Sequence, residues 1–481
     1  MRSFILSTII VLTLFSCSRN PVTGKKEVML MSEGQEIALG QESDPSIVAQ
    51  FGLYDNPTLS NFLAQKGGQM AAVSHRPNLS YTFRVLDSPV VNAFAVPGGY
   101  VYFTRGILGH FNNEAELAGV LGHEIGHITA KHSAKQYSTQ LLTQLLFIGG
   151  LVVSEDFRKF ADVAQQGMGL LFLKFSRDHE SESDKLGVDY STKIGYNAHE
   201  MADFFKTLKR LSDGAGAIPT FLSTHPDPGD RQVTVNKLAT EAQANLDVNA
   251  LKVNRNEYLK MIDGITYGED PKQGYVENNV FYHPELKFKY QLPNGWNTVN
   301  TPAQVSTAPA DGKALLALSA TNGTLNDVRN KTITENNLQV IEQANTSVNG
   351  LNAISMLSDV PSTNSNGQST PALRVLTYLI EYNGLIYKMH GLAEQTNFNG
   401  YFSTFQSAMR SFSILTDQAK INKQPMKIKI VTANKTATLQ QLLTEQGMPS
   451  NRLNELSILN GMELNETLTS GTMFKSLSGG Y

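Results

Sequence analysis

The chain has 481 residues, of which 41% are hydrophobic, and its formal net charge at pH 7 is −3. This length predicts roughly three domains, and the charge balance offers no basic field, so we expect no nucleic-acid partner. Cys17 is the single cysteine, which excludes an intramolecular disulfide.

The first 17 residues have the pattern of a bacterial lipoprotein signal. A short basic start precedes a mostly apolar run at 4–15, which is too short to span a bilayer as a mature helix. Leu-Phe-Ser-Cys at 14–17 resembles a lipobox and predicts lipidation of Cys17, and therefore a membrane anchor on an aqueous body. The alternatives are a cleavable signal without lipid and a buried free cysteine. The lipoprotein resemblance implies a periplasm-facing envelope protein at the outer membrane.

Residues 90–95 and 100–104 are β-prone, and Pro97-Gly98-Gly99 marks a turn between them. The pattern predicts a hairpin. An exposed edge strand there could pair with an extended peptide and present its scissile bond, without reading its sequence. The alternative is a hairpin arm inside the core.

Residues 114–136 read as a helix that carries the sequence His-Glu-Ile-Gly-His at 123–127. Asn113 with Glu116 predicts a capping box at its start. His123 and His127 are four residues apart and share one helical face, so they can hold one zinc ion. Glu124 lies on the flank of that face, where it can take a proton from a water that zinc activates. The alternative is a chance occurrence of the motif.

Zinc in a peptidase needs a third protein ligand. The metzincin pattern fails, because Ala130 and Ser133 stand where it requires glycine and histidine. His132 is about 140° round the helix from His127, which predicts a place on the outer face. Glu180 and Asp184 are the better candidates: they lie four apart on one helical face, as a ligand and a group hydrogen-bonded to a ligand histidine would. The alternative is a solvated acidic helix face.

Two further segments bear on the site. The apolar stretch 141–153 is short for a membrane span and is predicted to pack in the core or to form a flap. Residues 224–231, Thr-His-Pro-Asp-Pro-Gly-Asp-Arg, read as a loop because two prolines and a glycine lie close together.

Five motifs occur in one order, and together they resemble the zinc endopeptidase family that includes HtpX, BepA, LoiP and the CaaX-prenyl protease. They are CSRNPVTG at 17–24, VNAFAVPGGYVYFTRGIL at 91–108, HEIGH at 123–127, FSRDHESESDKLG at 175–187 and STHPDPGDR at 223–231. The resemblance spans roughly residues 20–265.

The resemblance implies roles for particular residues. The zinc ligands would be His123, His127 and Glu180, with Glu124 as the catalytic base. His225 and Arg231 would approach the metal and stabilise an oxyanion or gate the site. The segment Asn92, Ala93, Phe94 and Ala95 would border the substrate groove. Ser183 departs from the family, which usually has alanine there, and we expect little effect.

A helix is predicted to begin at a capping box formed by Asn197 and Glu200 and to run to Leu211, with Asp213-Gly214 ending it. Two further helices are predicted over 230–244 and 254–265. After residue 270 short alternating runs predict an α+β region. Its strands at 371–382 and 385–393 would be joined at Asn383-Gly384, and helices are predicted at 335–348 and 399–413. The region faintly resembles PsbP-like domains and shows no catalytic cluster, so His283 and His390 are interpreted as structural.

After a polar linker at 418–424, the last segment reads strand, helix, helix, strand and resembles a LysM module. Such modules bind peptidoglycan, which makes the cell wall a candidate partner. The alternative is a small docking domain.

The sequence thus predicts an α+β protein: a mostly helical zincin protease domain with a small edge-strand sheet, an α+β domain, and a LysM-like α/β module. The predicted divisions are 1–17 signal, 18–268 peptidase, 275–417 accessory domain and 425–481 module. The predicted function is that of a metalloendopeptidase with one Zn²⁺ per chain, acting on extended or misfolded envelope proteins. The alternative is a cell-wall-binding or chaperone-like scaffold, against which the intact Glu124 argues.

Overall fold

The computed structural model describes residues 17–29, 31–136, 175–215, 220–225, 228–360 and 373–480. Most of the predicted signal and the stretch 141–153 therefore lie outside the described residues. The fold is mixed α+β, as predicted at that level, and it divides into two compact units. The first unit contains Gly52–Gly268 and Met426–Gly479 with the N-terminal residues up to Val48, and the second contains Glu269–Pro425. Among the described helices, none has both the length and the apolar character needed to cross a bilayer.

The small sheet of the first unit has the strand order β3-β5-β4. Strands β3 (Thr82–Leu86) and β5 (Tyr100–Thr104) are parallel, and β4 (Ala93–Val96) is antiparallel to β5. Gly98 and Gly99 have φ of +82° and +98°, which glycine alone adopts easily, so the predicted hairpin turn forms between β4 and β5. Strand β4 is an edge strand of this sheet, and all four of its side chains are buried.

Helix α5 (Glu114–Thr129) forms the centre of the first unit, and every one of its residues is buried. The Asn113 side chain accepts a hydrogen bond from the Glu116 N–H, so the predicted N-cap is confirmed. The return bond is displaced by one residue, because the Glu116 carboxylate accepts from the Asn112 N–H at 2.8 Å. The helices that surround α5 in this unit are α3 (Pro57–Ala72), α4 (Arg105–His110), α9 (Arg177–Lys193), α10 (His199–Ala215), α11 (Thr220–Thr224), α12 (Pro228–Ala242) and α13 (Arg255–Ile262). The first helix within the described residues, α2 (Glu33–Phe51), precedes them.

Helices α5 and α9 approach each other through glycines. A Cβ added to Gly187 would lie 2.9 Å from the Gly119 carbonyl oxygen and 3.1 Å from the backbone nitrogen of His123. A Cβ on Gly122 would lie 3.0 Å from the Gly187 backbone. Only glycine permits this separation, which fixes the height of His123 relative to residues on α9.

The predicted helices of this unit are present with altered ends. Helix α10 continues to Ala215, so the prediction that Asp213-Gly214 ends it is wrong. The predicted cap at Asn197 forms with a different partner, because its side chain accepts from the His199 N–H at 3.1 Å. Helix α13 follows Asn254, which adopts a left-handed φ of +50°, and ends three residues earlier than predicted.

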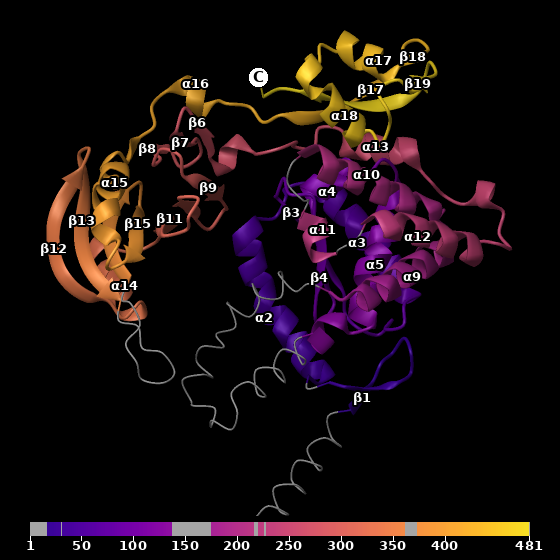
Figure 1. Cartoon of the computed structure of the whole chain (residues 1–481), viewed down its shortest axis with the longest axis horizontal. Helices are drawn as coiled ribbons and strands as arrows, with labels where there is room; N and C mark the ends of the chain where they lie inside the picture. Colours follow the sequence, from indigo (N-terminus) through magenta and orange to yellow (C-terminus); the bar gives the residue numbers. More distant parts are fainter. Residues whose placement is uncertain are drawn as a thin grey trace, which may run out of the picture. The chain divides into compact units, whose positions relative to one another are not determined.

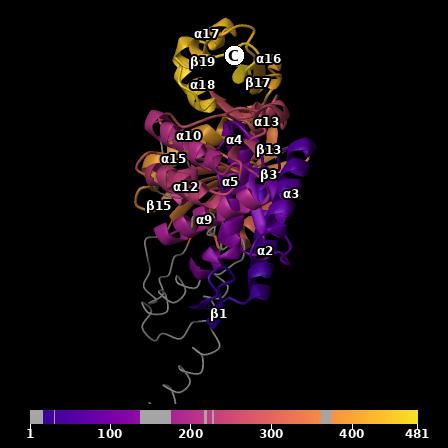
Figure 2. The same cartoon turned by 90° about the vertical axis from the view of Figure 1, so that its right-hand side faces the viewer.

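Residues 426–479 complete the first unit. The predicted order of strand, helix, helix, strand is confirmed in β17 (Lys427–Thr432), α17 (Leu439–Glu445), α18 (Leu453–Leu459) and β20 (Met473–Ser478), with the short strands β18 (Ala437–Thr438) and β19 (Thr467–Leu468) paired between them. This segment lies beside α10 and α13 (Figures 1 and 2). Its apolar side chains Ile428, Leu439, Leu456 and Phe474 share one hydrophobic core with α5.

Lys475 of β20 fastens this segment to the rest of the unit. The side chain is fully buried, and its ammonium donates to the carbonyl oxygens of Gly109 at 2.9 Å, Phe111 at 2.7 Å and Leu459 at 3.0 Å. Three acceptors match the three N–H donors of a lysine ammonium. Two of them belong to the residues just before α5, so the C-terminal segment supports the start of the central helix.

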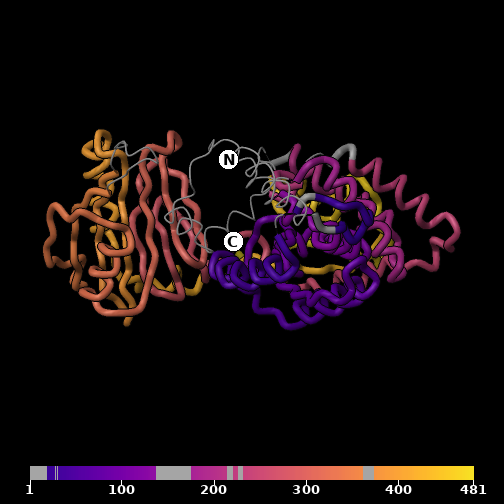
Figure 3. The backbone as a smooth tube through the Cα atoms, turned by 90° about the horizontal axis from the view of Figure 1, so that it is seen from below, coloured from indigo at the N-terminus to yellow at the C-terminus, as the bar shows by residue number. Residues whose placement is uncertain are grey.

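The second unit is built on a seven-stranded antiparallel sheet of order β12-β13-β14-β15-β11-β10-β9. Its strands are β9 (Asn297–Asn300), β10 (Val305–Ala308), β11 (Ala314–Thr321), β12 (Gln339–Val348), β13 (Leu351–Val360), β14 (Leu373–Tyr382) and β15 (Leu385–Glu394), and the longest run side by side in Figure 3. A smaller sheet joins β6 (Tyr275–Glu277), β7 (Val280–His283), β8 (Phe288–Gln291) and β16 (Ser413–Ile414). Helix α14 (Leu325–Glu335) and helix α15 (Phe398–Arg410) pack on the large sheet.

The sequence predicts this unit with one clear error. The hairpin turn at Asn383-Gly384 is confirmed, with φ of +50° and +78°, and α15 lies where a helix is predicted. The predicted helix 335–348 is wrong, because residues 339–348 form strand β12. His283 and His390 are partly buried in strands, and burial lowers the pKa of each to about 4.

Candidate metal centre

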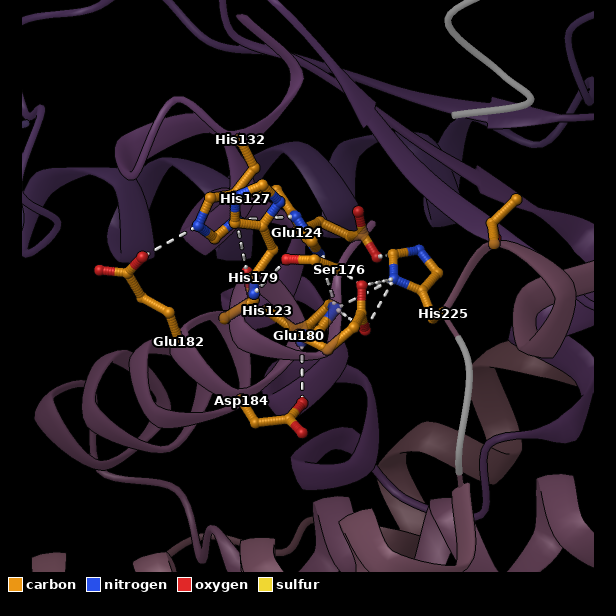
Figure 4. A network of polar contacts seen from close by, with 12 residues as sticks. His123, Glu124, His127, His132, Ser176, His179, Glu180, Glu182, Asp184 and His225 are labelled. Atoms are coloured by element: carbon orange, nitrogen blue, oxygen red, sulfur yellow. Dashed lines mark hydrogen bonds and ion pairs between the residues drawn. The ribbon is translucent and has the colours of Figure 1, made fainter. Parts of the chain in front are cut away.

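Three elements bring the ligand candidates together. His123 and His127 project from α5, Glu180 from the first turn of α9, and His225 follows α11 (Figure 4). One ligand atom from each of these four residues lies within 4.8 Å of the others, and all four side chains are buried. His123 Nε2 and His127 Nε2 each lie 3.5 Å from a Glu180 oxygen. The three predicted ligands thus converge, and His225 joins them as a fourth donor.

The donor set fits zinc. Imidazole nitrogens with a carboxylate are the ligands that zinc takes in proteins, and a buried group of four such donors is costly unless an ion or protons satisfy it. Burial and the neighbouring His123 hold the pKa of His127 well below its usual range, which keeps its imidazole neutral, as a ligand must be. The cluster also leaves the buried His225 Nε2 without a hydrogen-bond partner among the described residues.

Asp184 stands behind His123, one turn along α9 from Glu180. Its Oδ1 lies 3.0 Å from His123 Nδ1, so it can accept the proton on the nitrogen that faces away from the cluster (Figure 4). Burial opposes its ionisation, but Arg231 and His123 lower the pKa of Asp184 to about 2. The carboxylate therefore stays charged and orients the ring.

Arg231 of α12 ties the two acidic residues of α9 together. Its guanidinium donates to both oxygens of Asp184, at 2.8 and 2.5 Å, and reaches a Glu180 oxygen at 2.8 Å. The positive charge lowers the pKa of Glu180 against the effect of its burial, together with the larger contribution of His225. The shortest hydrogen bonds of Arg231 thus go to the two carboxylates, and longer contacts reach the His225 carbonyl oxygen at 3.4 Å and His123 Nδ1 at 3.3 Å. Its role toward an oxyanion stays a prediction.

Glu124 lies beside the cluster with an unused carboxylate. It is fully buried, and neither of its oxygens has a hydrogen-bond partner among the described residues. His225 Nε2 is 3.7 Å from Glu124 Oε1. Burial raises the pKa of Glu124, which is the direction that makes a carboxylate a better proton acceptor.

His225 lies between the base and the ligands. Its Nδ1 is 3.0 Å from Glu180 Oε1 and 3.3 Å from His123 Nε2. Burial opposes protonation, but the carboxylates of Glu180 and Glu124 raise the pKa of His225. The ring also stacks on Phe221 with centroids 4.5 Å apart. The loop signal at 224–231 gives no indication of this placement; only the family resemblance does.

The predicted position of His132 on the outer face is wrong. It is fully buried rather than on the outer face, with Nδ1 3.0 Å from His127 Nδ1 and Nε2 3.0 Å from Glu182 Oε2. The helical count fails because α5 ends at Thr129 and Lys131 adopts a φ of +57°, which turns the chain back toward His127. Ser183 Oγ lies 3.2 Å from His132 Nδ1, so this residue also contacts the network.

The predicted groove segment flanks α5. Asn92, Ala93, Phe94 and Ala95 are buried, and β4 packs against α5. The Thr104 hydroxyl donates to the Asn92 carbonyl oxygen at 2.9 Å, and the Phe94 ring stacks on Tyr102 with centroids 4.9 Å apart. Asn92 Oδ1 is buried without a hydrogen-bond partner among the described residues.

Cys17 opens strand β1 (Cys17–Arg19), which pairs with β2 (Lys26–Val28). The pairing places Cys17 opposite Val28. Lipidation of this residue stays a prediction.

Comparison with known proteins identifies the class. Two histidines one helical turn apart, a glutamate from a second helix and an adjacent glutamate that has no hydrogen bond among the described residues are typical of a zinc metallopeptidase site. Residues 57–239 match the family model described as Peptidase family M48. Over this region the chain is therefore similar to peptidase family M48.

Individual relatives agree with this family. Mitochondrial metalloendopeptidase OMA1 of Arabidopsis thaliana is 35% identical over 187 residues, which cover 38% of this chain and 36% of that protein. The putative beta-barrel assembly-enhancing protease of Vibrio cholerae is 30% identical over 185 residues, 37% of this chain and 38% of that protein. The chain thus spans little more than a third of the length of these two relatives.

Cyanobacterial PsbP from Synechocystis is 15% identical, with a TM-score of 0.24, over 30% of this chain and 91% of that chain. The PsbP-like character of residues 275–417 stays a prediction.

Proposed function

We propose that the chain is a zinc-dependent endopeptidase that hydrolyses extended or misfolded polypeptides of the bacterial envelope. The observation that carries the proposal is the buried Glu124 carboxylate, which has no hydrogen-bond partner among the described residues and lies beside the convergent donors His123, His127 and Glu180. A base held ready next to a metal site is what peptide hydrolysis needs.

A zinc ion held by His123, His127 and Glu180 would polarise the scissile carbonyl and activate water. Glu124 takes the proton of the attacking water and delivers it to the leaving amine as the peptide bond breaks. Asp184 and Arg231 hold the ligands in place during this cycle, because each contacts a ligand side chain or its partner. His225 either completes the ligand set at rest or turns toward the developing oxyanion. Its Nδ1 lies 3.0 Å from Glu180 Oε1, and its Nε2, which has no hydrogen bond among the described residues, lies 3.7 Å from Glu124 Oε1.

The substrate class follows from β4. This edge strand packs on the helix of the metal centre, and we propose that an extended substrate segment pairs with it along Asn92–Ala95. Folded proteins cannot add a strand there, so unfolded chains are selected. A relative named for enhancing β-barrel assembly supports envelope proteins as the substrate source.

The remaining elements of the proposal concern location. Lipidation at Cys17 would hold the enzyme at the outer membrane facing the periplasm, with residues 18–268 as the zincin peptidase domain, 275–417 as an accessory domain and 425–481 as a LysM-like module. Binding of peptidoglycan by that module would keep the enzyme near the cell wall. The strand, helix, helix, strand order of residues 427–478 is compatible with such a module.

The test compares the purified full chain with Glu124→Gln on unfolded casein, with bound zinc quantified in both proteins. We expect one zinc per chain in each and cleavage only by the unsubstituted protein, because the substitution removes the proton acceptor and leaves the ligands. A protein that contains no zinc would refute the proposal. Zinc-loaded protein without cleavage, combined with full in-cell function of Glu124→Gln, would favour the scaffold alternative.

A further inference from the structure

The two histidine ligands are supported in different ways. His123 has a carboxylate behind it, because Asp184 Oδ1 lies 3.0 Å from its Nδ1. Behind His127 there is a second imidazole, with His132 Nδ1 at 3.0 Å from His127 Nδ1 (Figure 4). Two ring nitrogens at this distance share one proton, so one of them must donate and the other accept.

The donor and acceptor are fixed by the cluster. His127 Nε2 faces the other ligands, 2.9 Å from His123 Nε2, so its lone pair belongs to the metal. Its proton then sits on Nδ1 and points at His132. His132 must offer a lone pair at Nδ1 and carry its own proton on Nε2.

Glu182 enforces that tautomer of His132. Its Oε2 lies 3.0 Å from His132 Nε2, and an ionised carboxylate accepts hydrogen bonds but cannot donate them. The proton of His132 is therefore held on Nε2, away from His127. Glu182 thus fixes the proton of His127 on Nδ1 through His132. Asp184 has the same effect on His123 by direct contact.

The relay is built into the fold. His132 is fully buried and stacks on His179, with ring centroids 4.3 Å apart and planes inclined by 19°. The Ser183 hydroxyl, 3.2 Å from His132 Nδ1, can donate to the same lone pair and so reinforces its role as an acceptor. Packing thus prevents the ring from turning away.

We propose that His132 and Glu182 are positioning residues of the metal centre, which fix the tautomer and orientation of His127 for zinc. The inference rests on the proposed zinc site and assigns a role to two residues outside the ligand set. Partners of ligand histidines typically contribute a factor of about 10 to 100 to metal affinity.

The experiment measures the zinc dissociation constant of the full chain by competition with a chromophoric chelator. His132→Phe keeps an aromatic ring beside His179 but removes the acceptor, and we expect it to weaken zinc binding by about 10- to 100-fold. His132→Asn restores an acceptor oxygen near the position of Nδ1 and should recover much of that loss. Glu182→Ala should weaken binding by about 10-fold. Asp189→Ala is the matched control for Glu182→Ala, because it removes a carboxylate of the same helix that is paired with Lys193 and not with His132. It should stay within about twofold of the unsubstituted chain.

A second readout is the visible absorption of the cobalt-loaded proteins. A displaced His127 changes the ligand field, so the spectra of His132→Phe and Glu182→Ala should differ from that of the unsubstituted chain, while the Asp189→Ala spectrum should match it. If His132→Phe does not fold, Glu182→Ala decides, because its side chain is 25% exposed and its removal leaves little cavity. Unchanged zinc affinity and an unchanged cobalt spectrum in folded Glu182→Ala would overturn the inference and leave the proposed function standing. An unsubstituted chain that binds no zinc would overturn both.

Discussion

Replacing Lys475 with methionine should weaken the peptidase unit by about 3 kcal/mol. The change keeps the length of the side chain but removes an ammonium that donates to three buried carbonyl oxygens at 2.7–3.0 Å. Hydrogen bonds from a charged donor contribute about 1.5 kcal/mol each or more, which gives roughly 4–5 kcal/mol for three. Relief from burying a charge offsets part of this sum, and about 3 kcal/mol remains.

Urea denaturation can assign the loss to one unit. Trp296 is the only tryptophan and lies in the second unit, so its fluorescence reports the unfolding of that unit alone. Circular dichroism follows the helices, and most of the described helices belong to the first unit. Lys475→Met should lower the midpoint of the helical transition and leave that of the Trp296 transition unchanged.

The matched control is Lys429→Met, because Lys429 is exposed on β17, the strand paired with β20. It removes the same charge without buried acceptors and should change stability by less than about 0.5 kcal/mol. If the Lys475 and Lys429 variants had the same stability, the three buried hydrogen bonds would contribute nothing, and the reasoning would be refuted.

Three further predictions concern other residues. Burial lowers the pKa of His110 from 6.5 to about 4, so the unfolded chain binds a proton first and the free energy of unfolding falls as pH drops from about 6.5 to about 4. His110→Asn should reduce that fall by about 2–3 kcal/mol in urea titrations at pH 4.5 and 7.5. An unaltered pH dependence would contradict the assignment. Gly187→Ala should lower the free energy of unfolding by about 1–3 kcal/mol and weaken zinc binding, because the new Cβ would lie 2.9 Å from the Gly119 oxygen and push α9 from α5. Chelator competition measures the zinc affinity. An unchanged affinity would show that the helix separation does not set the ligand geometry. Asn383→Ala should destabilise the second unit by about 1 kcal/mol, because φ at this turn residue is +50°, and the Trp296 transition measures the loss of stability. Asn345→Ala, at an exposed position within strand β12, is the control. Equal effects of the two substitutions would exclude the turn conformation as the cause.

The ligands can be predicted from sequence because they are local helical pairs. His123 with His127, and Glu180 with Asp184, are each four residues apart, so the periodicity of one helix settles which side chains share a face. Their distance from each other across the fold is not a local property. It depends on the glycine contact between α5 and α9, for which the sequence gives no pairing signal.

His132 and β12 could not be predicted for two different reasons. For His132, the predicted position assumes that the helical periodicity continues past Thr129, but the left-handed Lys131 interrupts the helix there. For β12, the ten residues are exposed on both faces over most of their length, so the alternation of apolar and polar residues that indicates a strand is missing. The antiparallel hydrogen bonds to β13 hold β12 in place. Such pairing is a tertiary contact, which the local sequence of β12 does not indicate.

The contact between Lys475 and Gly109 joins residues 366 positions apart in sequence. Contacts of this range form late, because a long loop must close before they repay its entropy. During synthesis the metal-binding helix therefore emerges long before the strand that supports its first turn, and its hydrophobic neighbours from residues 428–477 arrive last. We expect the nascent chain to lack hydrolytic competence until that strand docks.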